Sequence, residues 1–274
     1  MKTKEELDAI AYQMKLDILN MVYHAGKKGA HLGGSLSCVE ILAVLYGSIM
    51  KYRPDEPFWE QRDRFIISKA HGALALYAAL KQAGYLDQAD IDGALQGESQ
   101  FYEHPRMNVE KGLELSGGSL GQGLSFAVGS CLALQRKQNK QSQIYVLIGD
   151  GECNEGSVWE AAASVIHFDL RQITIIIDAN ELQFDGRTEE IMSAGKLADR
   201  WRSLGYDVTE VDGHQVRELT YALQKQAERP KVIIAHTVKG NGISFAENKV
   251  EWHSSFFTEE LYQQAVEDLM QCRK

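Results

Sequence analysis

The sequence predicts an α/β fold in which a mostly parallel sheet is flanked by helices. β-branched apolar runs alternate with helical patterns along the chain, which is typical of parallel sheets covered by helices. The clearest such unit, residues 144–186, has the order strand, glycine-rich turn, helix, strand and polar loop. The length of 274 residues and the lack of a proline-rich linker predict one domain over residues 1–274.

The first half of the chain predicts helices joined by polar turns. Apolar residues at helical spacing predict helices over residues 4–25, 71–83 and 119–135, the last buried and packed through small residues; residues 65–67 predict a strand. Residues 31–34 predict a break after the first helix. Ser37 and Glu40 then form a capping-box pattern, which predicts that a helix begins at Ser37. Residues 87–111 are polar and predict an irregular surface segment near the site.

The second half of the chain predicts the rest of the sheet. Strands are expected at residues 144–148, 173–177, 206–211 and 231–236, and helices at residues 155–167, 195–204, 216–228 and 258–271. Residues 247–255 predict a polar loop before the last helix. In a right-handed βαβ unit, the polar clusters that follow neighbouring strands meet at one edge of the sheet.

Two oxygen-bearing side chains follow neighbouring strands of this sheet. Asp150 stands between Gly149 and Gly151 after the first strand of the unit, and Asn180 follows the next strand. Carboxylate and amide oxygens suit Mg²⁺ or Ca²⁺, and Mg²⁺ typically keeps diphosphate oxygens in its octahedron. Glycines on either side of Asp150 let the backbone approach a phosphate closely. The pattern predicts a site for a metal and a diphosphate at this edge.

Composition and charge argue against nucleic-acid-binding and membrane proteins. The net charge is −9, and there is no basic cluster of the kind that binds nucleic acid. The apolar stretches are shorter than the roughly 20 residues that a membrane span needs, and residues 1–12 are charged rather than signal-like. The four cysteines lack metal-site spacing. We therefore expect a cytoplasmic protein with neither a nucleic-acid nor a membrane partner.

The strand-end pattern, with asparagine 30 residues after the aspartate, resembles the diphosphate-binding motif of thiamine diphosphate (ThDP) enzymes. A plain strand–turn–helix with a tight Gly-Asp-Gly turn is the alternative. The added Glu155-Gly156 pair, the segment 159–161 and the Asp185-Gly186 pair favour the ThDP motif.

Four histidines lie beside glycine, proline or loop residues: His31, His71, His104 and His253. Imidazoles bind hydroxyls and move protons near neutral pH, as sugar chemistry on ThDP requires. Each histidine alone is more often a surface or capping residue. Their common placement at predicted strand–helix junctions favours a shared site.

From end to end, the chain resembles the N-terminal half of transketolases, the ThDP diphosphate-binding (PP) domain. The matching segments, in chain order, are residues 33–37, 62–65, 68–71, 104–105, 118–123, the unit 144–186, and 237–240 leading to His253. The resemblance implies an α/β ThDP-binding fold, and it implies transferase activity on carbohydrates.

The resemblance also implies roles for individual residues. Asp150, Asn180 and the carbonyl of Leu182 would hold Mg²⁺, with Ca²⁺ or Mn²⁺ as substitutes. ThDP would contact His71, Gly118, Leu120, Gly149, Asp150, Gly151, Glu155, Asn180, Phe184, Lys239 and His253. The catalytic set would be His31, His71, His104 and His253. Glu155 would face the cofactor of a neighbouring subunit, although an exposed carboxylate at a helix N-terminus is also favourable by itself.

Five positions depart from the family pattern: Leu32, Ala70, Gly117, Asn241 and Ser254. The family generally has proline, glycine, threonine, lysine and glycine there. None of these departures removes a histidine or an expected metal ligand, so they bear on substrate preference more than on cofactor binding.

The chain ends at Lys274 without the half of a transketolase that carries the glutamate activating the aminopyrimidine ring. The resemblance therefore implies the first subunit of a split transketolase acting on sugars or sugar phosphates. Its partner would be a C-terminal, pyrimidine-binding subunit, in a dimer of heterodimers (a heterotetramer). The alternatives are the first subunit of a 2-oxoacid dehydrogenase, a deoxyxylulose phosphate synthase type, or a non-catalytic cofactor-binding paralogue. The histidine set favours transketolase.

Overall fold

A five-stranded parallel sheet lies at the centre of the structure, a computed structural model that describes residues 2–193 and 195–272. The strands are β1 (Arg64–Ile67), β2 (Ile144–Gly149), β3 (Ile173–Ala179), β4 (Asp207–Asp212) and β5 (Lys231–His236). Their order is β1-β2-β3-β5-β4, and every neighbouring pair is parallel. The predicted α/β class is confirmed, and each strand ends within two residues of its expected limits.

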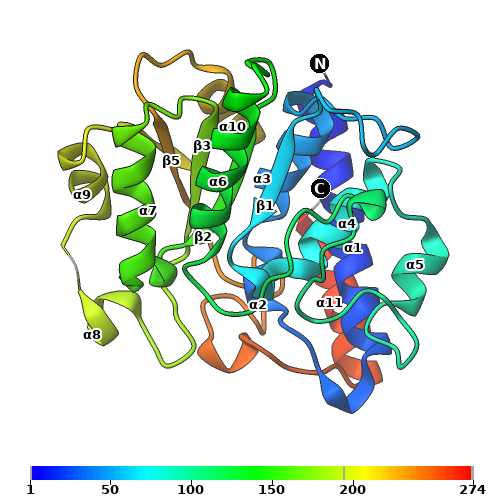
Figure 1. Ribbon diagram of the computed structural model, residues 1–274. Helices are drawn as coiled ribbons and strands as arrows, with labels where there is room; N and C mark the ends of the chain where they lie inside the picture. The colour runs from blue at the N-terminus through cyan, green and yellow to red at the C-terminus, as the bar shows by residue number, and fades with distance from the viewer. Residues whose placement is uncertain (1, 194, 273–274) are drawn as a thin grey trace.

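Helices cover both faces of the sheet (Figure 1). One layer holds α6 (Gly123–Arg136), α7 (Gly156–His167) and α9 (Leu197–Ser203); the other holds α1 (Lys4–His24), α3 (Val39–Val44), α4 (Ala73–Gln82), α10 (Val216–Gln224) and α11 (Glu259–Cys272). Successive side chains of a strand point to opposite faces. Val146 and Ile148 therefore join the core under α6 and α7, whereas Tyr145 and Leu147 join the core under α1 and α4. Burial on both faces explains the continuous apolar strand sequences.

Short helical elements fill the connections between these layers. They are α2 (Gly33–Leu36), α5 (Gln88–Gly93), α8 (Thr188–Met192), a π-helix at Leu45–Ile49, and 3₁₀ turns at Gly26–Lys28, Ala70–Gly72, Val109–Lys111, Gly151–Asn154 and Val250–Trp252. The segment 87–111 is thus more regular than predicted. The Asp87 side chain accepts from the Asp90 N–H, and the Asp90 side chain accepts from the Asp87 N–H. This reciprocal capping pattern is visible in the sequence.

The predicted capping box at Ser37 is wrong. Ser37 ends α2, and α3 begins only at Val39 without a side-chain cap. The Ser37 hydroxyl donates to Asp178 Oδ2 at 2.6 Å instead. Glu40 forms ion pairs with Lys15 at 2.8 Å and with His214 at 2.9 Å. A buried charge without a partner costs more free energy than an uncapped helix end. Ser37 and Glu40 therefore bond to buried charges on distant elements, and these tertiary contacts override the local capping pattern.

The glycine-rich helix near residue 120 also differs from its prediction. α6 begins at Gly123 rather than at Ser119, because Gly121 has a positive φ of 79° that a helix does not admit. Nor is α6 buried all round: Phe126, Gly129 and Ala133 are exposed along one side. The small residues of α6 therefore leave an uncovered face in this chain.

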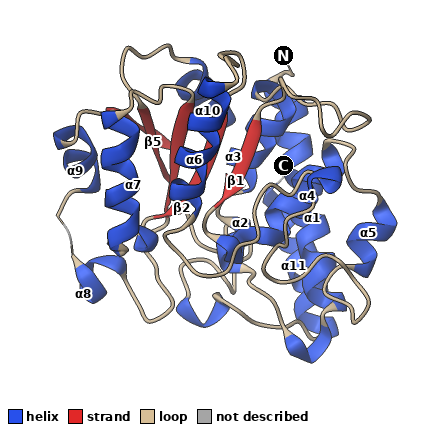
Figure 2. Cartoon of the chain, viewed as in Figure 1, coloured by secondary structure: helices blue, strands red, loops and turns tan. Residues whose placement is uncertain are grey.

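The loops that follow the strands gather at one edge of the sheet, below it in Figure 2. Parallel strands place all their carboxyl ends on the same side, which is where open α/β sheets bind ligands. Every predicted site residue except Glu155 lies in one of these loops or in the segments packed against them. Glu155 begins α7, immediately after such a loop.

Candidate active site

Asp150 lies at the carboxyl end of β2, beside the end of β3. Gly149 pairs with Asp178 in the sheet register, so the residues after both strands are neighbours. The Asp150 carboxylate accepts hydrogen bonds from the Gly151 N–H at 2.8 Å and the Glu181 N–H at 2.7 Å. Burial raises the pKa of Asp150, and the negative charge of Asp178 raises it further. A bound cation would remove that penalty on the charged form.

Asn180 and Leu182 lie next to Asp150, in the loop after β3. Asn180 Nδ2 donates to Asp178 Oδ2 at 3.2 Å, and Asn180 Oδ1 accepts from the Leu182 N–H at 3.1 Å. Only the amide nitrogen can donate to a carboxylate, so Asp178 fixes the direction of the amide. The amide oxygen consequently stays on the side of the Leu182 N–H.

The donor set fits a hard cation. Asp150, Asn180 and the Leu182 carbonyl offer three different kinds of oxygen, which Mg²⁺ accepts alongside phosphate and water. Within residues 2–193 and 195–272, no three His, Cys, Asp or Glu side chains group as metal ligands. A cation here would therefore depend on amide, backbone and ligand oxygens.

Two features beside Asp150 suit a phosphate group. Gly151 has no side chain, and a Cβ there would lie 2.7 Å from Gln183 Cγ, so a larger residue would have to displace the Gln183 side chain. Gln183 Nε2 is buried without a hydrogen-bond partner. An unpartnered buried donor beside a bare glycine would suit the oxygens of a diphosphate.

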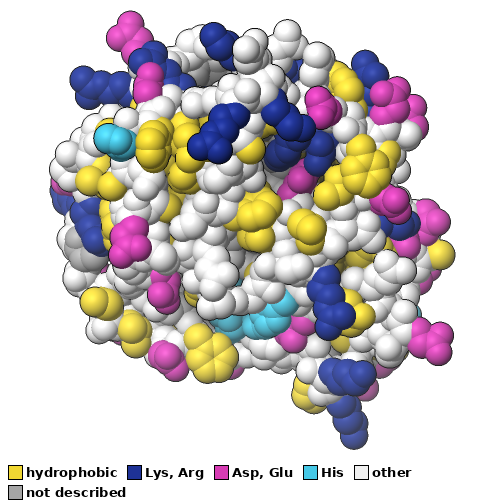
Figure 3. Space-filling view, viewed as in Figure 1, with side chains coloured by type: hydrophobic (Ala, Val, Ile, Leu, Met, Phe, Trp, Pro, Cys, Tyr) yellow, Lys and Arg dark blue, Asp and Glu magenta, His cyan; other side chains and the backbone are white. Residues whose placement is uncertain are grey.

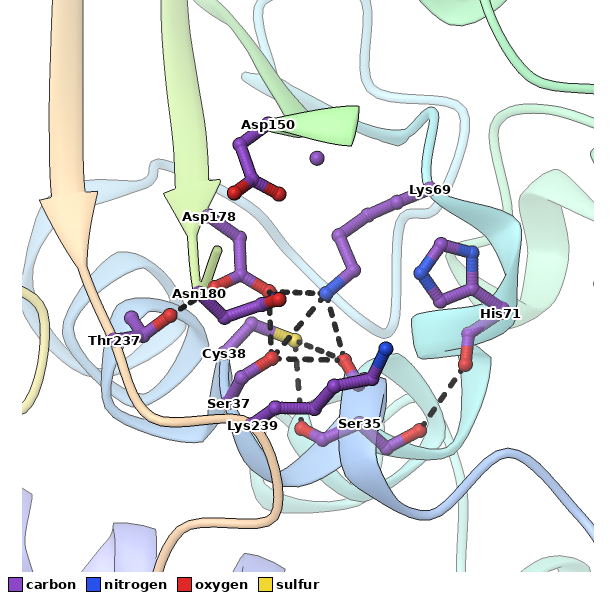
Figure 4. A network of polar contacts seen from close by, with 12 residues as sticks. Ser35, Ser37, Cys38, Lys69, His71, Asp150, Asp178, Asn180, Thr237 and Lys239 are labelled. Atoms are coloured by element: carbon purple, nitrogen blue, oxygen red, sulfur yellow. Dashed lines mark hydrogen bonds and ion pairs between the residues drawn. The ribbon is translucent and has the colours of Figure 1, made fainter. Parts of the chain in front are cut away.

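A buried ion pair, Lys69 with Asp178, lies beneath these residues and was not predicted from the sequence (Figure 4). Both side chains are fully buried. Lys69 also donates to the Gly34 carbonyl at 2.7 Å, and Asp178 accepts from Ser37 and Thr237. Burial opposes both charges, but the pairing outweighs it, lowering the pKa of Asp178 and raising the pKa of Lys69. The pair joins β1, β3 and α2, and it orients Asn180.

Glu152 is a second buried carboxylate that sequence reasoning missed. Its side chain accepts from the Gly121 N–H at 2.8 Å, from the Gly149 N–H at 3.1 Å and from the Ser68 hydroxyl. These bonds tie the 118–123 segment to the ends of β1 and β2. The only sequence signal was a glutamate directly after the Gly-Asp-Gly turn.

The four predicted histidines form one cluster. Figure 3 shows histidine side chains gathered in a recess of the surface. The His31 ring centroid lies 5.9 Å from that of His71, 5.3 Å from that of His104 and 5.1 Å from that of His253. His71 and His253 are 5.3 Å apart. Four segments distant in the sequence thus bring four imidazoles together, with His31 in contact with the other three.

Two of the clustered histidines, His71 and His253, are held in the neutral form by their surroundings. Burial lowers the pKa of His71 well below its usual value, and Lys69 lowers it further. Burial also lowers the pKa of His253 to about 3, with Lys239 adding to the effect. Neutral imidazoles can accept protons and hydroxyl hydrogen bonds, which charged ones cannot.

Lys239 lies between the histidine cluster and the loop after β3 that carries Leu182 and Gln183. Its Nζ contacts His253 Nδ1 at 2.9 Å and donates to the carbonyls of Leu182 at 3.0 Å and Gln183 at 3.2 Å. Burial lowers the pKa of Lys239 to about 8, with the Lys69 charge contributing. Phe184 is exposed, and its ring lies 5.2 Å from that of His253.

The remaining predicted residues lie at the rim of the site. Gly118 has a φ of 154° and open space where a side chain would stand. Leu120 is half-buried, whereas Glu155 is exposed at the start of α7. A Cβ on Gly121 would lie 2.9 Å from Glu155 Cβ, so Glu155 lies against the 118–123 segment. Of the predicted site residues, Glu155 has the least evidence for a role within this chain alone.

Two of the five departures from the family pattern compensate each other. A Cβ on Gly117 would lie 2.8 Å from Ala70 Cβ, closer than real side chains approach. Ala70 therefore fills the space that a threonine at 117 would use. Asn241 Oδ1 accepts from Lys15 Nζ at 2.5 Å, where a lysine would place two positive charges together.

A cavity of about 670 Å³ opens on the other side of Asp150, towards α8 and α9. Its lining includes Glu181, Arg187, Arg200 and His236, and none of the four clustered histidines. The cavity therefore touches the Asp150 end of the site and does not reach the histidine cluster. No helix in the described part of the chain has the length and apolar character needed to cross a membrane.

Comparison with known proteins places this chain in a family. The model of the transketolase thiamine diphosphate binding domain matches residues 9–269. The chain belongs to the transketolase family. It is 42% identical to the 6-deoxy-6-sulfo-D-fructose transketolase subunit of Clostridium sp. (strain MSTE9), over 89% of this chain and 90% of that protein. It is 37% identical to one of the subunits of the apulose-4-phosphate transketolase of Phocaeicola vulgatus, over 97% of this chain and 94% of that one.

A solved structure shows the same relation in three dimensions. The transketolase of Campylobacter jejuni matches with a TM-score of 0.90 and 28% identity, over 98% of this chain but 43% of that one. The predicted identity, the N-terminal half of a split transketolase and thus part of a ThDP-dependent transferase, is thereby confirmed. The oxoacid dehydrogenase and deoxyxylulose phosphate synthase alternatives are set aside.

Proposed function

We propose that this transketolase subunit transfers a two-carbon ketol unit from a ketose donor to an aldose acceptor, as the diphosphate-binding half of a two-chain enzyme. One observation carries the proposal: the four-histidine cluster lies beside the strand-end loops of Asp150 and Asn180, joined to them through Lys239. A group that binds sugar hydroxyls and a group that binds a metal diphosphate therefore share one site.

In this proposal Asp150, Asn180 and the Leu182 carbonyl hold Mg²⁺, which Ca²⁺ or Mn²⁺ can replace. Gly149, Gly151 and the 118–123 segment lie against the ThDP diphosphate and ring system. Phe184, His71, Lys239 and His253 complete the contacts. Bound ThDP supplies the electron sink that lets a carbon–carbon bond of the sugar break. Support comes from the oxygen donor set and from the bare Gly151 position beside Gln183.

The chain's own residues then handle protons and hydroxyls. His31, His71, His104 and His253 surround the reacting carbons in this proposal. The donor loses a hydroxyl proton when its carbon–carbon bond breaks, and the acceptor's carbonyl oxygen gains one when the new bond forms. The neutral state of His71 and His253 supports a role as proton acceptors.

The partner would be a C-terminal transketolase subunit that brings the carboxylate for the aminopyrimidine ring. This chain spans 90% and 94% of two relatives named as subunits, but 43% of the Campylobacter enzyme. The exposed side of α6, with Phe126, Gly129 and Ala133, and the rim residue Glu155 supply a surface for a second chain. We extend the proposal to a dimer of heterodimers, built on one domain over residues 1–274.

The substrate class and compartment are further parts of the proposal. Two relatives are named for a sulfonated ketose and for a phosphorylated one, which suggests a ketose with an anionic group at its far end. We place the enzyme in the cytoplasm, because Cys38, Cys131 and Cys153 are buried as free thiols.

A reconstitution experiment tests the two-chain proposal. The purified chain alone, with Mg²⁺, ThDP and a ketose–aldose pair, should show no ketol transfer. Mixing it with the product of a neighbouring gene for a second half should restore transfer and raise the apparent mass. Robust turnover by the verified single chain would show that the activating carboxylate lies within these residues.

A further inference from the structure

Glu103 lies in the histidine cluster and has no role in the proposed function so far. Its Oε1 lies 2.7 Å from His31 Nδ1, with side-chain exposures of 39% for Glu103 and 16% for His31. The carboxylate is thus at the mouth of the recess, against the histidine whose ring contacts the other three.

Both sides of this contact are anchored by the fold. On the histidine side, the Ser35 hydroxyl donates to the His31 carbonyl at 2.8 Å. On the other side, the Tyr77 hydroxyl donates to the Tyr102 carbonyl at 2.6 Å, and the Gly117 N–H donates to the Pro105 carbonyl at 3.0 Å. The backbone before and after Glu103 is therefore fixed, so the two side chains are held face to face.

His31 Nδ1 has no other described partner. It is buried, and the Glu103 contact lies off the direction of a hydrogen bond. A small side-chain rotation aligns the two, because the atoms are already within bonding distance. A proton on Nδ1 shared with a carboxylate leaves the lone pair on Nε2, at the opposite edge of the ring.

We propose that Glu103 is a positioning residue that holds His31 with its proton on Nδ1, so that Nε2 accepts a substrate hydroxyl proton. The proposal rests on ketol transfer as the reaction. When the donor's carbon–carbon bond breaks, the hydroxyl that becomes the aldehyde gives its proton to Nε2. That proton returns to the acceptor's carbonyl oxygen when the new bond forms. Glu103 keeps its charge throughout, stabilising the imidazolium that forms between the two steps.

The charges around His31 determine whether Glu103 raises or lowers the pKa of that imidazole. Burial lowers the pKa of His31, and Glu103 opposes this by raising it; His104 and Lys239 lower it. His71 and His253 are the other titratable groups that face the ring. Glu103 is thus the one described group acting to strengthen His31 as a base.

The test uses Glu103→Gln, which keeps the size and removes the charge, in the assembled enzyme with its partner. The matched control is Glu110→Gln, an exposed carboxylate on the same connecting segment. We expect kcat for E103Q to fall by about 10- to 100-fold, with KM for the donor and ThDP affinity little changed. The acidic limb of kcat/KM should move to lower pH, because His31 loses the group that raises its pKa. Glu103→Asp should recover part of the rate.

Each result bears on the proposal. Wild-type kcat and an unmoved pH profile for E103Q would overturn it, as would a loss of ThDP affinity that shows a purely structural role. Transfer by the wild-type assembly in the same experiment separates this failure from failure of the proposed function. A wild-type assembly that transfers no ketol unit would overturn both.

Discussion

The strand-end part of the site and the histidine part are built in different ways. Asp150, Asn180 and Leu182 all come from one βαβ unit, and backbone N–H groups hold the side chains of Asp150 and Asn180. The four histidines come from four segments, and Lys69, Lys239 and Glu103 side chains surround them. The first part is rigid because the sheet makes it. The second part depends on packing between segments, so substitutions far apart in the sequence can change how the histidines are arranged.

The largest expected effect is on the strand-end part. Asp150→Ala should abolish Mg²⁺-dependent ThDP binding in the assembled enzyme, because a diphosphate there would lose its bridging cation. The fold should remain, since Asp150 accepts only from donors at the same edge of the sheet. Calorimetry measures the loss, with Glu190→Gln on α8 as an exposed control. Unchanged ThDP affinity in the alanine variant would refute the site assignment.

The histidine part should respond in rate rather than in cofactor binding. His104→Ala and His253→Ala should retain ThDP yet lose ketol transfer by on the order of 10²–10⁴-fold if each moves protons. Steady-state rates with the partner present, paired with calorimetry, separate the two effects. Near-wild-type turnover in both variants would return these histidines to a structural role.

The buried ion pair links the two parts, so breaking it should damage both. Lys69→Met leaves Asp178 charged and unpaired in a fully buried place, which should lower the free energy of unfolding by about 3–5 kcal/mol. The Asp178 carboxylate that orients Asn180 would also lose its main partner, weakening ThDP binding. Urea unfolding measures the first effect. The double variant with Asp178→Leu should be more stable than Lys69→Met alone; an additive loss would show that the charges do not depend on each other.

A smaller effect should follow from the packing of residues 70 and 117. Gly117→Thr should destabilise the chain by about 1–3 kcal/mol through overpacking against Ala70. The double variant Ala70→Gly with Gly117→Thr should regain most of that stability. Thermal unfolding of the two variants and of Ala70→Gly checks this. Equal losses in the single and double variants would mean that the two positions are independent.

The smallest effect should be a dependence of stability on pH. His71 and His253 have folded-state pKa values below the roughly 6.5 of an unfolded chain. Below that pH the unfolded chain binds protons that the folded chain excludes, so stability falls as the pH drops. The melting temperature should fall less steeply with acid for the His71→Gln, His253→Gln variant. Parallel curves would contradict burial of neutral imidazoles.

The sequence predicted what local pattern determines. The strands of the βαβ unit and the neighbouring positions of Asp150 and Asn180 followed from apolar runs and their polar ends. The histidine cluster was predicted as a group from the placement of the four histidines at strand–helix junctions, and the family resemblance then gave the group a role. The roles of Lys69, Asp178 and Glu152 were missed. Their partners are distant in the sequence, so only the folded structure shows that these charges are buried and paired. The prediction at Ser37 failed for the same reason, because its hydroxyl donates to the buried Asp178 carboxylate instead of capping a helix.

The contact between positions 70 and 117 also limits which residues the two positions can hold together. Alanine at 70 with threonine at 117 would force two side chains into one space, because a Cβ on Gly117 would lie 2.8 Å from Ala70 Cβ. Glycine at either position relieves that contact. The two positions therefore behave as one unit, and a substitution at one of them is best made together with a substitution at the other.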